Sequence, residues 1–443
     1  MIKPTPLFSM PKVPLREGGP TRPEEARLRR AIRGQMEWMP CDLEAMVGEE
    51  HPARAIWQLL ETLDLSAFYR RIRAVLDRPG RPTTDPKVLL ALWLLATVEN
   101  VGSARRLAAL CEQHVAYRWL CGGVSVNYHG LSDFRLAHQE ALDNLLSQIV
   151  ACLMQAGAVD LKRVAQDGMR VRASAGASSY RRKEGLAECL REAERRVEEL
   201  AREQPGPAAS KREQAARERA AGERLARVKK AFDYLPQAEA IKENQKRKFT
   251  KARRAGVGEA RVSTTDPEVN VMKMPDGGFR PAYNVELATD SANGIIVGVA
   301  VTAQGTDAGL AAPMEEQVSK RLGQHPASYL IDGGFNSRAD ITTLARRGVD
   351  VYMPVREPRN KAGNERYQPG QGDTSEVKAW RERMATEEAK DIYRGRASTA
   401  EWANAQVRWH GLSRFTVRGL AKVTTFMLLV AVAHNLFRWV ALG

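Results

Sequence analysis

An acid at the end of an apolar run is the first candidate for chemistry in this chain. The apolar residues 329–331 lead to Asp332, and two glycines then turn the chain. Ser337 begins a helix in the pattern of a capping box, with Asp340 three residues on. The stretch therefore predicts a buried strand that ends on a carboxylate, at the edge where open α/β sheets bind ligands. Ordinary turn chemistry at Asp332 is the alternative interpretation.

A second acid, Asp167, lies within residues 159–171, whose alternation of apolar and polar side chains predicts a strand or a pair of strands. If this first strand and the fourth, which ends at Asp332, are neighbours at the middle of a sheet, the two carboxylates meet across it. A site for two divalent metal ions needs a further hard oxygen ligand, commonly from a following helix. Glu401 is the natural candidate, because alanines four residues before and after it suit close packing against a sheet.

Basic and aromatic residues accompany this third acid. Arg394 and Arg408 lie seven residues before and after Glu401, share its helix face and could hold phosphates there. Trp402, next to Glu401, could stack on an unpaired base, although core packing is the simpler use. Other acids close to the core motifs, Glu286 among them, are better explained by a structural role.

Composition narrows the class of partner. The chain has 443 residues, enough for two or three domains with a sizeable core. Its formal net charge of +15 and its pI of about 9.7 favour a polyanionic partner, of which nucleic acid is the commonest. Membrane-surface binding is the rival interpretation, but we find no lipidation motif or signal peptide. The five scattered cysteines, with no C-x-x-C pair, indicate reduced thiols in a cytosolic protein.

The apolar C-terminal residues 423–442 could be read as a membrane span. His434, Asn435 and Arg438 interrupt them, however. A buried terminal helix is therefore the preferred interpretation, and no membrane partner is expected.

Helices are predicted throughout residues 51–156. They are expected to begin at about residues 55, 86, 103, 114 and 131. The fourth stops at the glycine pair 122–123, and the last is a long helix that reaches Leu153. Arginines among these helices could form a helix-turn-helix-like DNA reader, or could lie on solvated helix faces. They are Arg105, Arg106, Arg118 and Arg135.

The sequence changes character in residues 180–262. Apolar residues recur every three or four positions on both sides of a proline turn at 205–207, which predicts an antiparallel helical hairpin. Because it ends in a basic run at 246–254, the hairpin is either a solvated insertion or a DNA-binding arm. Residues 282–301 then predict a β-hairpin. The full order is strand, helical insertion, hairpin, helix, strand, helix, strand.

Together, these stretches resemble the DDE transposases of bacterial insertion sequences. The residues that carry the resemblance are 164–173, 281–285, 330–335 and the helix 393–408, whose order and spacing are more specific than any one of them. The resemblance spans about 160–440, behind a helical N-terminal domain. It implies an α/β fold: an RNase H-like mixed sheet with flanking helices, preceded by an all-helical domain and interrupted by a helical-hairpin insertion.

The expected domain organisation has four parts. Residues 1–40 form a basic, Pro-rich arm that could lie along phosphates or remain an uninvolved tail. Residues 41–157 form a helical DNA-binding domain. Residues 158–178 and 263–443 form the RNase H-like catalytic domain, and residues 179–262 form the charged helical-hairpin insertion.

Position by position, the resemblance assigns Asp167, Asp332 and Glu401 to the family's catalytic, metal-binding triad. It implies two Mg²⁺ ions, for which Mn²⁺ can substitute, bound by these carboxylates. The ions would activate water or a 3′-hydroxyl for attack on a phosphodiester and stabilise the leaving oxygen. Hydrolysis then nicks the transposon end, and the freed 3′-hydroxyl attacks target DNA.

Residues 393–408 also fall near a tyrosine-arginine-glutamate-lysine signature of related enzymes, with two departures. Arg408 stands in place of the lysine, which keeps the charge but changes the hydrogen-bond geometry. Four residues separate Arg396 from Glu401 where the signature has three, so a regular helix turns Arg396 away from Glu401. Arg394 is the alternative. The DNA contacts expected from the whole sequence are Arg105, Arg106, Arg135, Tyr393, Arg394, Arg396 and Arg408.

The expected function is that of a transposase, which binds the ends of an insertion sequence and catalyses metal-dependent cleavage and strand transfer. Its expected partners are double-stranded DNA, as terminal inverted repeats and as target, and a second copy in a homodimer. The expected location is the cytoplasm, on the nucleoid. Two alternatives stay open: a DNA-binding regulator or inactive transposase derivative, and an RNase H-like nuclease that only hydrolyses DNA.

Overall fold

The computed structural model describes residues 42–70, 72, 82–203, 208–248, 258–356, 363–409 and 412–442. The predicted arm at 1–40, the proline turn at 205–207 and most of the basic run at 246–254 lie outside these residues. Every helix and strand described below belongs to one compact unit, Leu43–Gly443.

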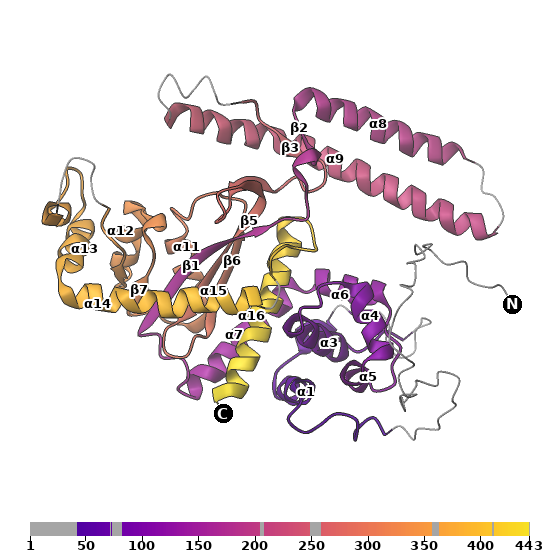
Figure 1. The fold of residues 1–443 in the computed structure, drawn as a ribbon, viewed down its shortest axis with the longest axis horizontal. Coiled ribbons are helices and arrows are strands. Elements are labelled where there is room, and N and C mark those ends of the chain that lie inside the picture. The colour runs from indigo at the N-terminus through magenta and orange to yellow at the C-terminus, as the bar shows by residue number, and fades with distance from the viewer. Residues whose placement is uncertain are drawn as a thin grey trace, which may run out of the picture. The chain divides into compact units, whose positions relative to one another are not determined.

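Helices make up the described part of the N-terminal region (Figure 1). They are α1 (Pro52–Thr62), α2 (Ser66–Tyr69), α3 (Pro86–Val98), α4 (Ala104–Gln113), α5 (Val115–Cys121), α6 (Tyr128–Ala137) and α7 (Gln139–Gln155). Side-chain caps explain two of the starts: Asp85 accepts a hydrogen bond from the Lys87 amide at α3 (2.8 Å), and Ser103 caps α4. Gly122 ends α5 with a φ of +54°, which glycine adopts without strain. The first four predicted helices are confirmed.

The single long helix predicted from Leu131 to Leu153 is wrong, because the chain breaks at His138 into α6 and α7. His138 has a φ of −119° and a ψ of 36°, outside the helical region. Its ring packs against Phe134, with centroids 4.6 Å apart, and against Phe68, at 5.3 Å. The break allows α6 to contact α3 and α4 while α7 packs along α16. Apolar spacing stays helical across the break, so periodicity alone cannot reveal it.

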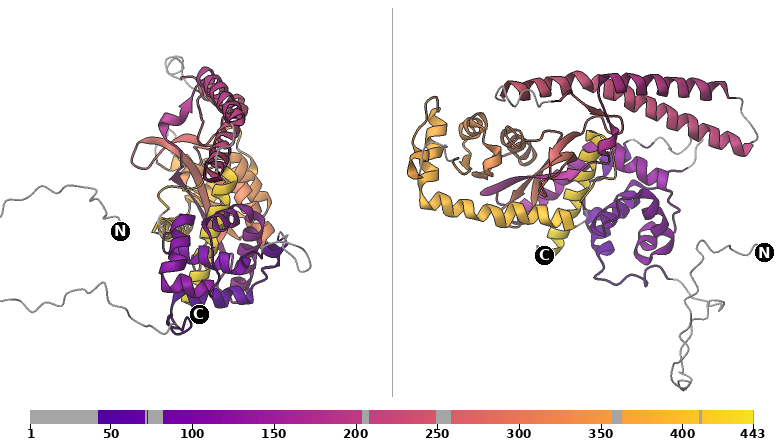
Figure 2. Two further views of the ribbon diagram at one scale, coloured as in Figure 1. Left: turned by 90° about the vertical axis from the view of Figure 1, so that its right-hand side faces the viewer. Right: turned by 45° about the horizontal axis from the view of Figure 1, so that its top comes forward.

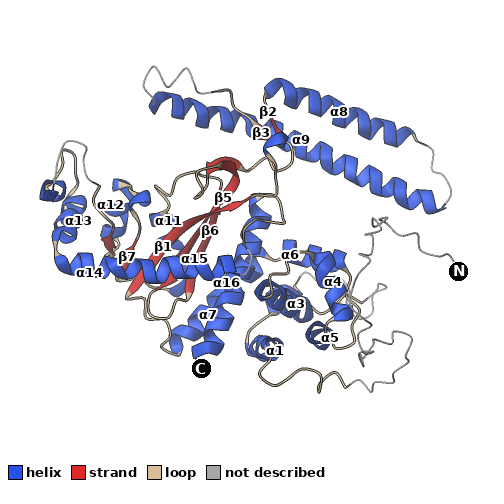
Figure 3. Ribbon diagram, viewed as in Figure 1, coloured by secondary structure: helices blue, strands red, loops and turns tan. Residues whose placement is uncertain are grey.

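A mixed sheet carries the acidic candidates (Figure 3). Its strands are β1 (Arg163–Arg172), β4 (Asn270–Lys273), β5 (Phe279–Asp290), β6 (Ile296–Thr302), β7 (Ser328–Leu330) and β8 (Asp350–Tyr352). Their order is β4-β5-β1-β7-β8, and β6 also pairs with β5. β5 is antiparallel to β1, β4 and β6, whereas β1, β7 and β8 run parallel. The predicted hairpin is confirmed. The strand that carries Asp167 pairs with the strand that precedes Asp332, which is the condition under which the two carboxylates were expected to meet.

The remaining elements surround or interrupt this sheet. The insertion holds α8 (Lys183–Arg202) and α9 (Ala208–Lys248), framed by the short paired strands β2 (Tyr180–Arg181) and β3 (Val262–Ser263). After β6 come α11 (Ala311–Leu322), α12 (Arg338–Arg346), α13 (Ser375–Ala385), α14 (Glu387–Arg396), α15 (Trp402–Trp409) and α16 (Leu420–Leu442). Short turns of other helix types are η1 (Ala177–Ser179), η2 (Gly333–Phe335), η3 (Gly363–Tyr367) and η4 (Ala397–Glu401).

Different helices cover the two faces of the sheet. Side chains alternate along a strand, so the register of Gln166, Ala288 and Gly298 across β1, β5 and β6 puts these three residues on one face. α11 packs there so closely that a Cβ at Gly298 would lie 2.7 Å from Met314 Sδ. Asp167 projects from the other face, where it meets α15.

The insertion is a pair of long helices lying side by side (Figures 1 and 2). Ion pairs such as Arg224–Glu192 (2.8 Å) join α8 to α9. Buried Leu186 of α8 and Leu235 of α9 belong to a small apolar cluster of the insertion. The predicted helical hairpin is confirmed, although α9 continues through Pro236 instead of ending near it.

α16 is long and apolar enough to cross a membrane by length and composition, but 67% of its most apolar window is buried inside the molecule. Its polar residues bind the turn between β5 and β6. Asn435 pairs with both backbone groups of Ile296, at 2.9 and 2.8 Å, and His434 Nε2 lies 2.9 Å from the Gly294 carbonyl. The interrupting polar residues therefore satisfy buried backbone groups, as expected of a buried terminal helix.

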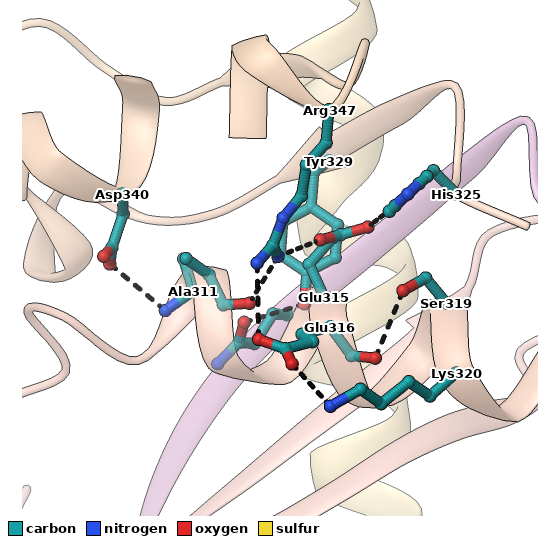
Figure 4. Close-up of polar contacts among 11 residues, drawn as sticks. Ala311, Glu315, Glu316, Ser319, Lys320, His325, Tyr329, Asp340 and Arg347 are labelled. Atoms are coloured by element: carbon teal, nitrogen blue, oxygen red, sulfur yellow. Dashed lines mark hydrogen bonds and ion pairs between the residues drawn. The ribbon is translucent and has the colours of Figure 1, made fainter. Parts of the chain in front are cut away.

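A buried acid ties α11 to α12 beside β7. Glu315 is fully buried, and its two carboxylate oxygens bind Arg347 Nη1 (2.6 Å) and His325 Nδ1 (2.5 Å), as Figure 4 shows. Asp340 of α12 accepts a hydrogen bond from the Ala311 amide at the start of α11 (3.3 Å). These charge-assisted contacts fix both helices, and with them the loop before α11 and the turn after β7.

Candidate functional site

Asp167 lies on β1, and Asp332 follows the neighbouring parallel strand β7. β1 and β7 pair with Ala165 opposite Leu330, and Asp167 and Asp332 lie two residues further along each chain. The Asp332 carboxylate accepts a hydrogen bond from the Gly334 amide (2.6 Å) within the turn η2. The two negative charges act on each other. The carboxylates predicted to meet across the sheet therefore lie within electrostatic reach.

The turn after Asp332 leads into α12 through a side-chain cap. Ser337 accepts a hydrogen bond from the Asp340 amide (3.2 Å), so the predicted helix start is confirmed. In a full capping box the Asp340 carboxylate would accept a hydrogen bond from the Ser337 amide. Here it accepts one from the Ala311 amide at the start of α11 instead. This contact links the Asp332 turn to the loop between β6 and α11.

The helix that carries Glu401 contains a π-turn. α14 leads into η4, which is π-helical, and α15 continues from it; the three follow one another in Figure 1. A π-turn closes five residues on, so Arg396 and Glu401 share a face. Arg396 Nη2 donates to Glu401 Oε1 (3.2 Å), and Nη1 lies 3.6 Å from Asp167 Oδ1. The prediction that Arg396 turns away from Glu401 is therefore wrong, because the π-turn absorbs the extra residue.

Asp167 is a half-buried carboxyl whose negative charge is only partly neutralised. Its side chain is 19% exposed, whereas that of Glu401 is 60% exposed. Burial raises the pKa of Asp167 to about 6; the charge of Arg396 opposes this rise and that of Asp332 adds to it. Asn404 Nδ2 donates to Asp167 Oδ2 (2.8 Å). The carboxyl is therefore mostly ionised at neutral pH but gains from any added cation.

An open cavity of about 660 Å³ adjoins these groups. Its lining comes from β1, from the last residue of η4 and from α15, and consists of Asp167, Gly168, Glu401, Asn404, Ala405 and Arg408. Two of the three predicted acids thus face one solvent-connected space, with an exposed arginine on the same helix. The space can admit a ligand much larger than a single ion.

Some of the other residues of the predicted signature lie close to the acids, and others do not. The Arg396 guanidinium lies 5.9 Å from the centroid of the Tyr393 ring. Burial raises the pKa of Tyr393, and the charge of Arg396 opposes the rise. Arg394 is 70% exposed and pairs with Asp391 instead. Arg408 is exposed and lines the cavity. The structure therefore gathers Tyr393, Arg396 and Arg408 around the acids, and not Arg394.

Asn404 is a site residue that sequence reasoning missed. It follows Glu401 by three residues, about one helical turn. An amide on the same helix face as Glu401 is therefore the feature of the sequence that could have indicated it. Trp402, by contrast, serves packing: a Cβ at Gly294 would lie 2.6 Å from its ring, and the ring meets His434 edge-on at 5.8 Å.

The arginines predicted to contact DNA from the helical region differ in exposure. Arg105 and Arg106 are exposed on α4, with the Arg105 guanidinium 5.2 Å from the Tyr128 ring centroid. Arg135 is buried: it donates to the Gly102 carbonyl (2.7 Å) and lies 4.2 Å from the Trp93 ring centroid. Burial lowers the pKa of Arg135 to about 10. Arg135 is therefore a core residue whose side chain does not reach a DNA backbone from this position.

Whether the site suits a metal ion depends on its donors. Among the described residues, no group of three or more His, Cys, Asp or Glu side chains is close enough together to hold an ion. The donor chemistry nevertheless fits a hard divalent cation, because Asp167, Asp332 and Glu401 offer carboxylate oxygens and Asn404 Oδ1 is buried without a hydrogen-bond partner. Arg396 supplies the positive charge between two of the acids.

Two family models match this chain. One, described as Transposase domain (DUF772), matches residues 41–136, and the other, described as Transposase DDE domain, matches residues 262–436. Together they cover more than half of the chain, and the second includes Asp332 and Glu401, whereas Asp167 lies between the two. No curated protein and no solved structure matches.

Proposed function

Since the chain belongs to the DDE transposases of insertion sequences, we propose that it binds the ends of such an element and catalyses metal-dependent DNA cleavage and strand transfer. Asp167, Asp332 and Glu401 are the proposed catalytic triad. The observation that carries this proposal is the Arg396 guanidinium, which joins Asp167 to Glu401 at 3.6 and 3.2 Å beside an open cavity. Carboxylates from distant parts of the chain are thus gathered at the end of adjacent parallel strands.

Arg396 is the residue that changes partners in the proposed mechanism. Its guanidinium lies between Asp167 and Glu401 and offsets their negative charges, which would otherwise repel each other. If the acids held a cation, Arg396 would be free to turn to a DNA phosphate, which a guanidinium binds in a bidentate geometry. Arg408, at the rim of the same cavity, holds a second phosphate.

The triad would hold Mg²⁺, or Mn²⁺ in its place. Two such ions would supply Lewis-acid activation of water or a 3′-hydroxyl and stabilise the leaving oxygen. The residues of the chain prepare this chemistry: Asp167 has to be ionised, and Asn404 fixes the direction of its carboxylate through the 2.8 Å hydrogen bond. Tyr393 packs beside Arg396 and limits where its guanidinium can turn.

The proposal extends to the fold and to the partners. The order of strands, three antiparallel strands followed by two parallel to the first, supports an RNase H-like core. The helical region before β1 is the proposed binder of the terminal inverted repeats, with Arg105 and Arg106 exposed on α4. A net charge of +15 supports double-stranded DNA as the partner, on the cytoplasmic nucleoid. A homodimer that pairs two element ends completes the proposal.

The proposal is tested with purified protein, labelled element-end DNA and Mg²⁺ or Mn²⁺. Asp167→Asn and Glu401→Gln should each lower cleavage by about 10³-fold or more, because a metal ligand contributes several kcal/mol of transition-state stabilisation. DNA binding should be retained. Asp391→Asn is the matched control, since Asp391 lies on α14 but is exposed and pairs with Arg394; its cleavage rate should match the wild type.

Three other results have distinct meanings. Full cleavage by Asp167→Asn would exclude the triad. Cleavage without any joining of a 3′ end to target DNA would identify a nuclease. DNA binding without cleavage, in wild type and variants alike, would identify a regulator or an inactive derivative.

A further inference from the structure

A cluster of oxygen atoms lies on the face of β1 opposite to Asp167. Gly168 and Glu286 are register partners on β1 and β5, and the alternation of side chains puts Glu286 on the α11 face. A Cβ at Gly168 would lie 2.6 Å from Glu286 Oε1, 3.1 Å from Asp307 Oδ1 and 3.2 Å from Asn284 Oδ1. Three side-chain oxygens, two from β5 and one from the loop before α11, thus lie around the position that a side chain at residue 168 would occupy.

Two residues of this cluster are buried, Asp307 is half-buried, and the cluster lacks a positive charge. Asn284 and Glu286 are 1% and 0% exposed. Asn284 Nδ2 donates to Glu286 Oε1 and to Asp307 Oδ1, both at 2.7 Å, but Asn284 Oδ1 is buried without a partner. No Lys, Arg or His among the described residues forms an ion pair with either acid. Arg170, on the same face of β1, donates to two backbone carbonyls instead.

Asp307 connects the cluster to the Asp332 turn. A Cβ at Gly334 would lie 2.8 Å from Asp332 Oδ1 and 3.1 Å from Asp307 Oδ2. Because both oxygens lie this close to one position, the distance between them cannot exceed the sum of these two values. One oxygen of Asp307 thus faces Asn284 and the other faces Asp332. The loop that carries Asp307 is anchored one turn later, where Asp340 binds the start of α11 (Figure 4).

Hydrogen bonds across three strands hold the cluster in place. Gln166 Nε2 donates to Glu286 Oε2 (2.9 Å), and the hydroxyl of fully buried Tyr329 on β7 donates to Gln166 Oε1 (2.8 Å). Glu286 therefore has little freedom to turn away from Asn284. A rigid set of carboxylate and amide oxygens, with one oxygen unpaired, is the donor set of a hard divalent cation.

We propose that Asp307 is a further metal ligand of this protein. With Asn284 Oδ1 and Glu286 it forms a seat for a divalent cation on the α11 face of β1, next to Asp332. The inference rests on the proposed metal-dependent function and adds two carboxylates to its triad, Glu286 of β5 and Asp307 of the loop before α11. The seat also explains Gly168, because any side chain there would fill it.

Mn²⁺ binding to the purified full-length protein, without DNA, tests the seat. Electron paramagnetic resonance separates free from bound Mn²⁺ and gives both affinity and stoichiometry. Asp307→Asn should weaken the binding of at least one ion by about tenfold or more. Asp276→Asn is the matched control, since Asp276 is exposed and pairs with Arg280 (2.7 Å) away from the cluster; its binding curve should match the wild type.

Asp332→Asn, measured in parallel, separates this inference from the function on which it rests. Weakened Mn²⁺ binding in Asp332→Asn together with wild-type binding in Asp307→Asn would overturn the seat and leave the proposed function standing. Wild-type binding in both variants, or no Mn²⁺ binding by the wild type, would overturn both.

Asn284→Asp provides a second readout, thermal stability. The substitution removes the amide that joins two carboxylates and adds a third acid, so the protein should melt at a lower temperature than the wild type in the presence of a chelator. Added Mn²⁺ should then raise its Tm by more than it raises that of the wild type. Equal Mn²⁺-dependent shifts would contradict the seat.

Discussion

Glu315 is a fully buried acid and Asp167 a half-buried one, both near β7, and they differ in how their carboxylate oxygens are paired. Each oxygen of Glu315 has its own partner, Arg347 at 2.6 Å and His325 at 2.5 Å. Asp167 shares Arg396 with Glu401, and the nearer guanidinium nitrogen, at 3.6 Å, is too distant for a hydrogen bond.

Among the described residues, no buried side-chain atom of Glu315, Arg347 or His325 lacks a hydrogen-bond partner, whereas several buried atoms around β1 do. Buried atoms without a hydrogen-bond partner include Arg396 Nη1, Asn404 Oδ1 and Asn284 Oδ1. Buried polar groups are normally satisfied, and each exception calls for an explanation. The difference indicates that the Glu315 cluster stabilises the fold, whereas polar atoms around Asp167 remain available to bind a ligand. Four predictions test this division.

The largest effect on stability should come from breaking the satisfied cluster. Glu315→Gln leaves Arg347 without its buried counter-charge and should lower the free energy of unfolding by about 3 kcal/mol. Glu316→Gln is the matched control on the same helix. Glu316 is 44% exposed and pairs with Lys320 (2.5 Å) and more loosely with Arg347 (3.3 Å), so its loss should cost less than about 1 kcal/mol. Urea unfolding of both variants measures the difference. Equal losses would remove the distinction between the clusters.

Asp167 should behave in the opposite way. Its pKa rises from 3.8 to about 6 on folding, so the folded protein binds the proton more tightly and loses stability as pH rises between these values. Asp167→Asn removes this loss and should stabilise the chelator-treated protein by about 3 kcal/mol at pH 7.5, two pKa units at 1.36 kcal/mol each. The advantage should vanish near pH 4. A variant less stable than the wild type at pH 7.5 would contradict the burial cost of this carboxyl.

Comparing Arg396 with Arg394 tests the difference between an arginine inside the site and one outside it. Arg396→Ala should lower cleavage by on the order of 10²-fold, the usual cost of losing a donor to the reacting group. Arg394→Ala should stay within about twofold, since Arg394 is exposed and pairs with Asp391. Single-turnover cleavage at saturating DNA compares them. Reversed effects would restore the phosphate role that the sequence suggested for Arg394.

The smallest effect should be electrostatic. Arg408 is exposed at the cavity rim, and Arg408→Ala should make the log–log salt dependence of DNA binding shallower by about 0.9, the contribution of one phosphate contact. Binding titrations at several salt concentrations measure this slope, with Arg394→Ala as the unchanged control. An unaltered slope in Arg408→Ala would place the DNA backbone elsewhere.

Much of the fold follows from local chemistry. The apolar run before Asp332, the alternation around Asp167, and the caps Asp85, Ser103 and Ser337 are read from neighbouring residues, and the structure has strands and helix starts there. The break at His138 was missed because helical periodicity continues across it. Arg135 looked like a surface arginine, since burial against Trp93 depends on how α3 and α6 pack.

The candidate site was predictable in its acids and not in its geometry. Asp167, Asp332 and Glu401 stand out by sequence context, and the resemblance to a transposase family joined them. Asn404 and Asp307 do not stand out in the sequence, because an isolated amide and a loop aspartate carry no local pattern. Their positions beside Asp167 and Asp332 depend on how α15 and the β6–α11 loop pack on the sheet.

The sequence by itself determined the family, the strands that end on acids and the helix that carries Glu401, because these depend on residue type and spacing along the chain. The tertiary structure decided how the Glu401 helix turns. Its π-turn adds one residue to one turn, which brings Arg396 between Asp167 and Glu401 where a regular helix would turn it away. A π-turn is intrinsically unfavourable and depends on packing against the sheet. The effect of the extra residue between Arg396 and Glu401 can therefore be judged only in the folded chain.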